Sequence, residues 1–140
     1  MTMHAGFTAR HIKAPAACEV LIVEDDNISR RVLHTILTQL GFGHIDIEDN
    51  GEAAVSAAAG KGYDLIFMDL RLPVLDGLSA ARKIMADCAD ERPVMIAVTT
   101  NTLPEIKQQC MAAGMADYIV KPYYKATLVE VLDHYFPVVQ

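Results

Sequence analysis

Acidic side chains follow two of the most apolar runs in the sequence, where packing does not require them. Glu24, Asp25 and Asp26 follow the run 20–23, and Asp69 ends another run. Two carboxylates about 4 Å apart repel by about 4 kcal/mol at an effective dielectric of about 20, so they must take up a proton or hold a cation. Oxygen ligands suit Mg²⁺, and no His or Cys lies beside these motifs to favour zinc. The pattern therefore predicts Mg²⁺ bound by Glu24, Asp25 and Asp69.

Two further apolar runs end in side chains that suit a phosphoryl group. Thr99 ends the run 94–98 and offers a hydroxyl donor, and Lys121 ends the run 118–120 and offers a compact positive charge. A carboxylate nucleophile beside Mg²⁺ and a cationic side chain can form an aspartyl phosphate, because both cations neutralise charge on the transferring group. We therefore interpret Asp69 as the nucleophile.

Each of these features alone has a simpler structural explanation. An acidic pair after a strand often caps a helix or lies in a solvated loop, Lys121-Pro122 is typical of a turn, and so is Asp76-Gly77. The ordered combination of all four polar strand ends favours a site over these separate explanations.

The elements that must position these side chains alternate along the chain. Uninterrupted apolar runs predict buried strands, and a weaker alternating run predicts an edge strand: 19–23, 64–68, 93–98 and 117–120, with the edge at 44–48. Helical periodicity and start or stop signals such as Thr102 and Pro104 predict the intervening helices: 27–40, 52–59, 78–87, 104–113 and 125–136. Strand–helix alternation indicates an α/β, doubly wound, five-stranded parallel sheet. In such sheets ligands bind at the carboxyl ends of the strands, which is where the polar residues fall.

Composition narrows the function classes further. The chain has 140 residues, 52% of them hydrophobic, and a formal net charge of −6. No basic cluster exceeds Arg30-Arg31, which argues against a nucleic-acid surface. The three cysteines have no metal spacing and predict a reducing, cytoplasmic location. No apolar run is long enough to span a membrane. We expect a tail over 1–17, one domain over 18–137, and no second domain.

Four motifs in order resemble the receiver domain of two-component response regulators. They are Leu21-Ile22-Val23-Glu24-Asp25-Asp26, Met68-Asp69-Leu70-Arg71-Leu72-Pro73-Val74-Leu75-Asp76-Gly77, Ala97-Val98-Thr99 and Ala116-Asp117-Tyr118-Ile119-Val120-Lys121-Pro122. The resemblance covers nearly everything except the tail. It implies a flavodoxin-like (βα)5 fold with strand order 2-1-3-4-5.

The resemblance also implies a role for each site residue. Asp69 would accept a phosphoryl group from a histidine kinase or a histidine phosphotransfer protein, and Lys121 and Thr99 would bind phosphoryl oxygens. Asp25 would ligate Mg²⁺ directly, Glu24 mainly through a water, and the backbone carbonyl of Arg71 would add a further ligand. Tyr118 occupies the position of the switch aromatic and would turn inward when Thr99 moves toward the phosphate. The Lys121-Pro122 bond would be cis.

Several positions depart from the commonest pattern of the family or tune it. Thr100 stands where Ala or Gly is usual and narrows access to the site, and Arg71 and Asn101 occupy positions that tune phosphoryl lifetime. Ile28 extends the apolar helix stripe beyond the core, and together with Tyr123 it indicates a docking surface for the phosphodonor. A partly buried first-turn residue and a solvated loop charge are the structural alternatives for Ile28 and Arg71.

The expected function is a single-domain phosphorelay receiver that switches protein interactions and is not an enzyme in the usual sense. A receiver domain that belongs to a hybrid histidine kinase fits the same motifs. A haloacid-dehalogenase-type phosphohydrolase also forms an aspartyl phosphate, but Arg71 stands where that family needs a second Asp. A receiver that no longer accepts phosphate is a third alternative, against which the intact Asp69, Thr99 and Lys121 argue.

Overall fold

The computed structural model describes residues 13–88 and 91–138, which form five strand–helix units. The elements in chain order are β1 (Glu19–Val23), α1 (Asn27–Gln39), β2 (His44–Glu48), α2 (Gly51–Gly60), β3 (Leu65–Asp69), α3 (Gly77–Asp87), β4 (Val94–Thr99), α4 (Pro104–Ala112), β5 (Asp117–Val120) and α5 (Lys125–Leu132). All strand pairs are parallel, and the strand order is β2-β1-β3-β4-β5. The predicted doubly wound flavodoxin-like fold is confirmed.

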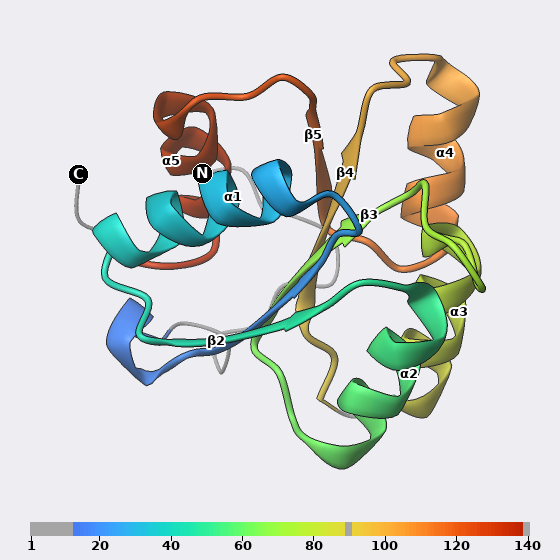
Figure 1. Cartoon of the computed structure of the whole chain (residues 1–140), viewed down its shortest axis with the longest axis horizontal. Helices are drawn as coiled ribbons and strands as arrows, with labels where there is room; N and C mark the ends of the chain where they lie inside the picture. Colours follow the sequence, from blue (N-terminus) through green and yellow to red (C-terminus); the bar gives the residue numbers. More distant parts are fainter. Residues whose placement is uncertain (1–12, 89–90, 139–140) are drawn as a thin grey trace.

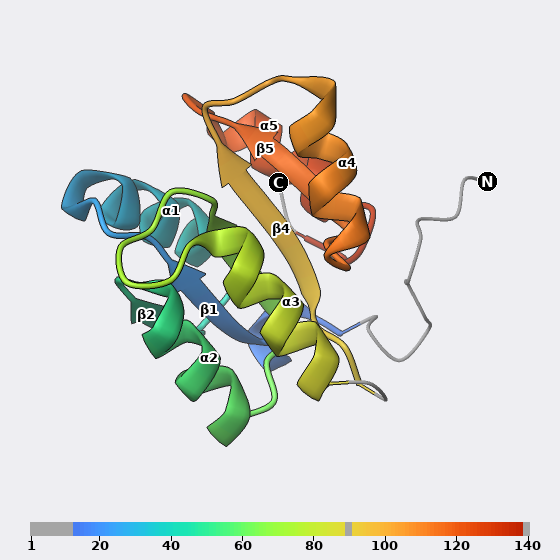
Figure 2. The same cartoon turned by 90° about the vertical axis from the view of Figure 1, so that its right-hand side faces the viewer.

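Two helical layers cover the sheet, and strand alternation divides the core between them. Figure 1 shows α1 and α5 on one face and α2, α3 and α4 on the other, and the turned view in Figure 2 brings the second group forward. Val20 and Ile22 pack on the α1/α5 side, whereas Leu21 and Val23 pack on the other. Successive strand side chains point to opposite faces, so a strand buried on both faces must be apolar throughout.

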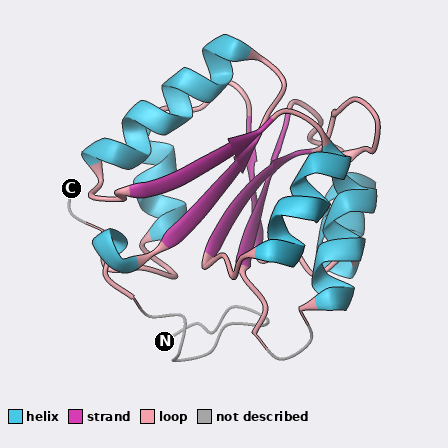
Figure 3. Cartoon of the chain, turned by 60° about the horizontal axis from the view of Figure 1, so that its bottom comes forward, coloured by secondary structure: helices cyan, strands magenta, loops and turns pink. Residues whose placement is uncertain are grey.

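Among the described residues, the sheet has two edge strands, β2 and β5. The alternating sequence predicted the edge at 44–48, whereas the prediction that 117–120 is buried on both faces is wrong, because β5 is the other edge and is mostly half-buried. β2 pairs only with β1 and is half-buried to exposed along its length, whereas β3 and β4 are buried throughout. The strands lie side by side between the two helical layers in Figure 3. Their carboxyl ends therefore share one edge of the sheet, where the polar residues collect.

Side-chain caps begin three of the helices close to this edge. Asp26, Asn50 and Asp76 each accept a hydrogen bond from the backbone N–H three residues later, at 2.8–2.9 Å. Thr102 is not a cap: α4 begins after Leu103 with Pro104 in its first turn. The caps fix how each chain segment leaves its strand end.

The fifth helix is shorter than the apolar pattern predicted. It ends at Leu132, and the chain turns through 133–135 while Tyr135 and Phe136 remain buried. The Tyr135 hydroxyl donates to the Ala116 carbonyl at 3.1 Å. The apolar spacing predicted a longer helix because these two aromatic residues are buried beyond the helix end.

Only the end of the predicted tail is described. Residues 1–12 lie outside the described residues, whereas Pro15–Ala17 form a 3-10 turn with Pro15 buried. The Lys13 ammonium lies 2.9 Å from the Asp64 carboxylate. Within 13–88 and 91–138, no helix is both long enough and apolar enough to cross a bilayer.

Candidate functional site

Three carboxylates meet at the carboxyl ends of β1 and β3. Carboxylate oxygens of Glu24, Asp25 and Asp69 lie within 4.8 Å of one another. Glu24 and Asp69 are buried, at 4% and 6% exposure, whereas Asp25 faces solvent. Three hard oxygen donors with one open side match the preference of Mg²⁺ for a few carboxylates and several waters. The donor set therefore fits the predicted metal.

Lys121 joins the two buried carboxylates from the end of β5. Its Nζ lies 2.5 Å from Glu24 Oε1 and 2.8 Å from Asp69 Oδ2, and its side chain is 21% exposed. The Lys121-Pro122 peptide bond is cis, as expected. One ammonium thus contacts residues that are 97 and 52 positions away in the chain.

Backbone N–H groups hold the other oxygens of the same two carboxylates. Asp26 N donates to Glu24 Oε2 at 3.1 Å, and Arg71 N donates to Asp69 Oδ1 at 2.8 Å. Each buried carboxylate is therefore oriented on both sides. The second contact also brings the Arg71 backbone beside Asp69, which is where its carbonyl was expected to serve the metal.

Burial and charge change the protonation of this cluster. Burial raises the pKa of Glu24 to about 7, against the lowering effect of its hydrogen bond with Lys121. Burial lowers the pKa of Lys121, but the hydrogen bonds with Asp69 and Glu24 outweigh it, so the net shift of the Lys121 pKa is upward. The ammonium therefore stays charged at neutral pH, while Glu24 is the carboxyl that most readily takes a proton.

Thr99 ends β4 at the same edge of the sheet, and Tyr118 lies on the neighbouring strand β5. Asp69 pairs with Val98 in the β3–β4 ladder, so Thr99 lies one residue beyond Asp69 on the neighbouring strand. The buried Thr99 hydroxyl oxygen accepts from Asn101 N at 2.9 Å. Tyr118 is half-buried against the core beneath α3 and α4, and the Lys107 ammonium lies 5.4 Å from its ring centroid.

The residues expected to tune the site have exposed side chains. Arg71, Thr100 and Asn101 are all exposed. Thr100 also lines a groove of about 400 Å³ between the start of α1 and the β5–α5 loop. The other residues that line this groove are Ile28, Ser29, Val32, Lys121, Pro122 and Tyr123.

The predicted docking residues meet in this groove. Ile28 and Val32 are 75% and 43% exposed, which is high for large apolar side chains. Tyr123 is half-buried beside them, and burial raises its pKa to about 12. The structure thus joins Ile28 and Tyr123 next to Lys121, although they are far apart in sequence.

Sequence reasoning missed a close backbone contact under the nucleophile. A Cβ atom on Gly77 would lie 2.1 Å from the Asp69 carbonyl oxygen and 2.8 Å from Leu70 Cα. The Asp76-Gly77 pair indicated a turn, and nothing in the sequence indicated this contact. Gly77 lets the first turn of α3 pack directly on the end of β3.

The comparisons with known proteins agree with this geometry. The family model described as "Response regulator receiver domain" matches residues 20–133. The chain belongs to this family. It is a receiver domain of two-component signalling systems.

Curated relatives are much longer proteins. "Probable histidine kinase 1" of Oryza sativa subsp. indica is 33% identical over 85% of this chain and 15% of its own length. "Two-component system protein A" of Emericella nidulans is 39% identical over 84% of this chain and 17% of its own length. The chain thus spans less than a fifth of these relatives.

Solved receiver structures match most of this chain. The receiver domain of sensor histidine kinase PA1611 from Pseudomonas aeruginosa PAO1, with magnesium coordinated in its active site cleft, is 40% identical, with a TM-score of 0.76 over 84% of this chain and 96% of that chain. The receiver domain of Saccharomyces cerevisiae Ssk1, solved with the phosphotransfer protein Ypd1, is 29% identical, with a TM-score of 0.76 over 84% and 88%.

Proposed function

We propose that Asp69 accepts a phosphoryl group from the phosphohistidine of a histidine kinase or a histidine phosphotransfer protein. The observation that carries this is the buried Asp69 carboxylate held between the Lys121 ammonium and the Arg71 N–H. In the transfer, the bond between phosphorus and the histidine nitrogen breaks and a bond between phosphorus and an Asp69 carboxylate oxygen forms. The electron pair of the broken bond stays on the imidazole nitrogen.

Other groups around Asp69 would bind the metal ion and the phosphoryl oxygens. Asp25, Glu24, Asp69 and the Arg71 carbonyl would hold Mg²⁺, which when bound neutralises charge on the phosphoryl oxygens. Lys121 would exchange its contact with Asp69 for a phosphoryl oxygen, and the Thr99 hydroxyl would donate to another. This assigns the domain a part in its own phosphorylation and dephosphorylation.

The same site would pass its state to the surface through Thr99 and Tyr118. Thr99 accepts from Asn101 N, so drawing its hydroxyl toward the phosphate would release that contact and open space for the half-buried Tyr118 ring. Arg71, Thr100 and Asn101 would set the phosphoryl lifetime by admitting or blocking water, and all three side chains are exposed.

The donor would dock in the groove that contains Ile28 and Tyr123. This groove adjoins Lys121 and contains the exposed apolar Ile28 and Val32. The Ssk1 receiver domain forms a complex with a histidine phosphotransfer protein, which supports a donor of this class. A cytoplasmic location stays a prediction, and so does the division into a tail over 1–17 and a domain over 18–137. The long curated relatives are consistent with a domain of a larger kinase, and the chemotaxis protein CheY4 of Vibrio cholerae, matched over 98% of that chain, is consistent with a single-domain receiver.

Labelling with acetyl phosphate and Mg²⁺ tests the chemistry. Intact-mass analysis should find one added phosphoryl group on the wild-type protein and on the control Asp87→Asn, which alters an exposed carboxylate on α3, and none on Asp69→Asn. Equal labelling of Asp69→Asn would refute the assignment. Continuous turnover of p-nitrophenyl phosphate would instead favour the phosphohydrolase.

A second arm tests the docking surface separately. Ile28→Glu should slow transfer from a phosphorylated histidine phosphotransfer protein at least about tenfold while leaving labelling by acetyl phosphate unchanged. Met111→Glu, at another exposed apolar position on α4, is the matched control. Equal slowing of the transfer by both variants would count against docking of the donor in this groove.

A further inference from the structure

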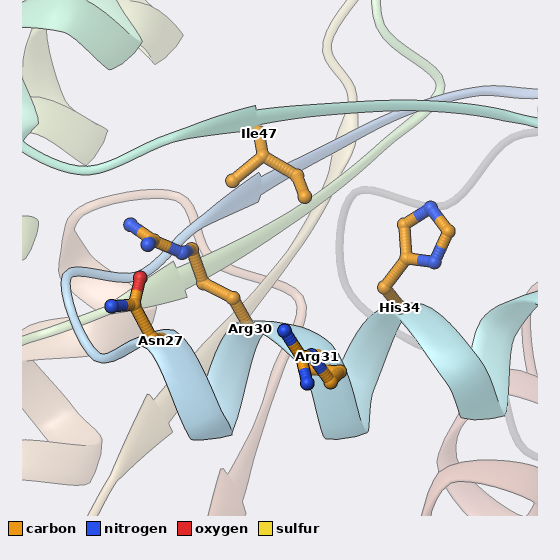
Figure 4. A pocket seen from close by; sticks show the side chains of 5 residues that line it. All are labelled: Asn27, Arg30, Arg31, His34 and Ile47. Carbon is orange, nitrogen blue, oxygen red and sulfur yellow. The ribbon is translucent and has the colours of Figure 1, made fainter.

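A second cleft lies on the opposite side of α1 from the docking groove, between this helix and the edge strand β2. It has a volume of about 530 Å³ and is lined by Asn27, Arg30, Arg31, His34 and Ile47. Figure 4 shows Asn27, Arg30 and His34 extending from α1 toward the strand that carries Ile47. Ile47 is 41% exposed, so the helix leaves this end of the sheet uncovered.

The positive charges in this cleft have no carboxylate partner among the described residues, unlike three lysines elsewhere on the domain. Lys13, Lys61 and Lys121 each lie within 3 Å of an acidic side chain. In the described part of the chain, neither Arg30 nor Arg31 makes a salt bridge. Arg82 and Lys83 on α3 are also adjacent and make no salt bridge within the described residues, but Arg30 and Arg31 differ from them because both line a cleft.

Helix stability does not account for these arginines either. α1 contains no acidic residue, and Asp26, one turn before Arg30, is engaged by Ser29 N at 2.8 Å. Arg30 and Arg31 lie in the half of the helix nearer its positive end, so the helix dipole does not favour cations there. Arg30 donates one hydrogen bond to the Glu24 carbonyl at 3.3 Å, which leaves most of its donors available.

The surroundings indicate which anion would fit. The outer edge of β2 has no strand partner among the described residues, and Ile47 adds an apolar contact at the same edge. A compact phosphate would satisfy the guanidinium groups but leave the strand edge and Ile47 untouched. An extended polypeptide with acidic side chains would satisfy all three, because strand addition uses main-chain hydrogen bonds and places alternate side chains on one face.

The two faces of β2 differ in which side chains of a bound segment they would favour. Asp46, on the other face, is already bound by Lys61 at 2.9 Å and by the Tyr63 hydroxyl at 2.6 Å. Acidic side chains are therefore favoured only on the α1 side, where guanidinium groups can bind carboxylates in a bidentate manner. We propose that the cleft between α1 and β2 binds an acidic, extended segment of a partner protein along the outer edge of β2.

Binding of a labelled peptide tests this proposal on the full chain. Fluorescence anisotropy with a fluorescein-tagged Glu-Val-Glu-Val-Glu-Val peptide at low salt should give saturable binding that weakens as NaCl is added. The double variant Arg30→Gln/Arg31→Gln should weaken binding at least about tenfold. The matched control Arg82→Gln/Lys83→Gln removes two exposed cations from α3 and should leave it unchanged. Thermal melts check that every variant is folded.

Three outcomes would overturn the proposal. They are no binding at millimolar peptide, equal binding of a Lys-Val-Lys-Val-Lys-Val peptide, and equal losses in the two double variants. Displacement of the peptide by an equal concentration of pyrophosphate would reassign the cleft to small anions. Since none of these measurements involves phosphorylation, failure here leaves the assignment of Asp69 intact.

Discussion

Replacement of Lys121 by Met removes the only side chain that contacts both buried carboxylates among the described residues. The variant leaves Glu24 and Asp69 with side chains 6% and 8% exposed, and with oxygens within 4.8 Å of each other. At that separation two ionised carboxylates repel by about 3 kcal/mol at an effective dielectric of about 20, unless Glu24, with its raised pKa, takes up a proton. Removal of one partner from a buried ion pair costs about 3–5 kcal/mol. We therefore expect Lys121→Met to lower the free energy of unfolding in metal-free buffer by about 3–5 kcal/mol.

Thermal unfolding in EDTA measures this loss. For a domain of this size it corresponds to a fall in Tm of roughly 10–15 °C. Added Mg²⁺ should narrow the gap from wild type, because a cation replaces the missing positive charge. The combined variant Asp69→Asn/Lys121→Met should recover much of the loss without metal, because only one of the two buried charges remains.

Lys61→Met is the matched control. Lys61 also bridges two carboxylates, Glu19 at 2.8 Å and Asp46 at 2.9 Å, but its side chain is 42% exposed. Solvent screens such a pair, so the control should lose far less stability. If both lysine variants lose the same Tm, or if Mg²⁺ leaves the gap at Lys121→Met unchanged, burial of the acidic cluster is not what makes Lys121 important.

Three further perturbations follow from the same geometry. Gly77→Ala should lower the free energy of unfolding by about 1–3 kcal/mol in urea titrations, because its Cβ would overlap the Asp69 carbonyl oxygen. Gly60→Ala, with nothing within 4 Å, is its control and should not lose stability. Without metal, the free energy of unfolding should fall as pH rises from 4.5 to about 7, because the raised pKa of Glu24 makes the folded state hold its proton more tightly than the unfolded state does; Glu24→Gln should remove that slope. Val74 has a φ of 69° and is 75% exposed, so Val74→Asn should stabilise the domain by about 1 kcal/mol in the same titrations, and a loss would contradict the strain.

The strands and their polar ends could be predicted because burial on both faces leaves little choice of residue. A run as apolar as 94–98 is stable in a sheet that is covered on both faces. Thr99 at its end then lies at the edge of the sheet where the other polar strand ends also lie. Local patterns do not show which of the three adjacent acidic residues is buried. Glu24, Asp25 and Asp26 are adjacent and chemically alike, and only the structure shows that Glu24 is buried on Lys121 while Asp26 caps α1.

The features that sequence missed arise from contacts between distant segments. Gly77 resembles any turn glycine until its approach to Asp69 is known. Arg30 and His34 resemble an ordinary solvated helix face, and only the position of β2 turns that face into a cleft. Local patterns predict which residues are buried, but they do not predict which surfaces meet.

The hydrogen bonds of the site also separate the carboxylates that folding fixes from the one that it leaves open. Both oxygens of Glu24 and both oxygens of Asp69 have donors, from Lys121 and from backbone N–H groups. Within the described residues no donor contacts the Asp25 carboxylate, which is exposed at the mouth of the cluster. A hydrated cation can therefore reach Asp25 without displacing a bond of the folded protein, whereas it competes with Lys121 for the other two. All three carboxylates could thus serve the metal, but only Glu24 and Asp69 also accept hydrogen bonds of the folded protein.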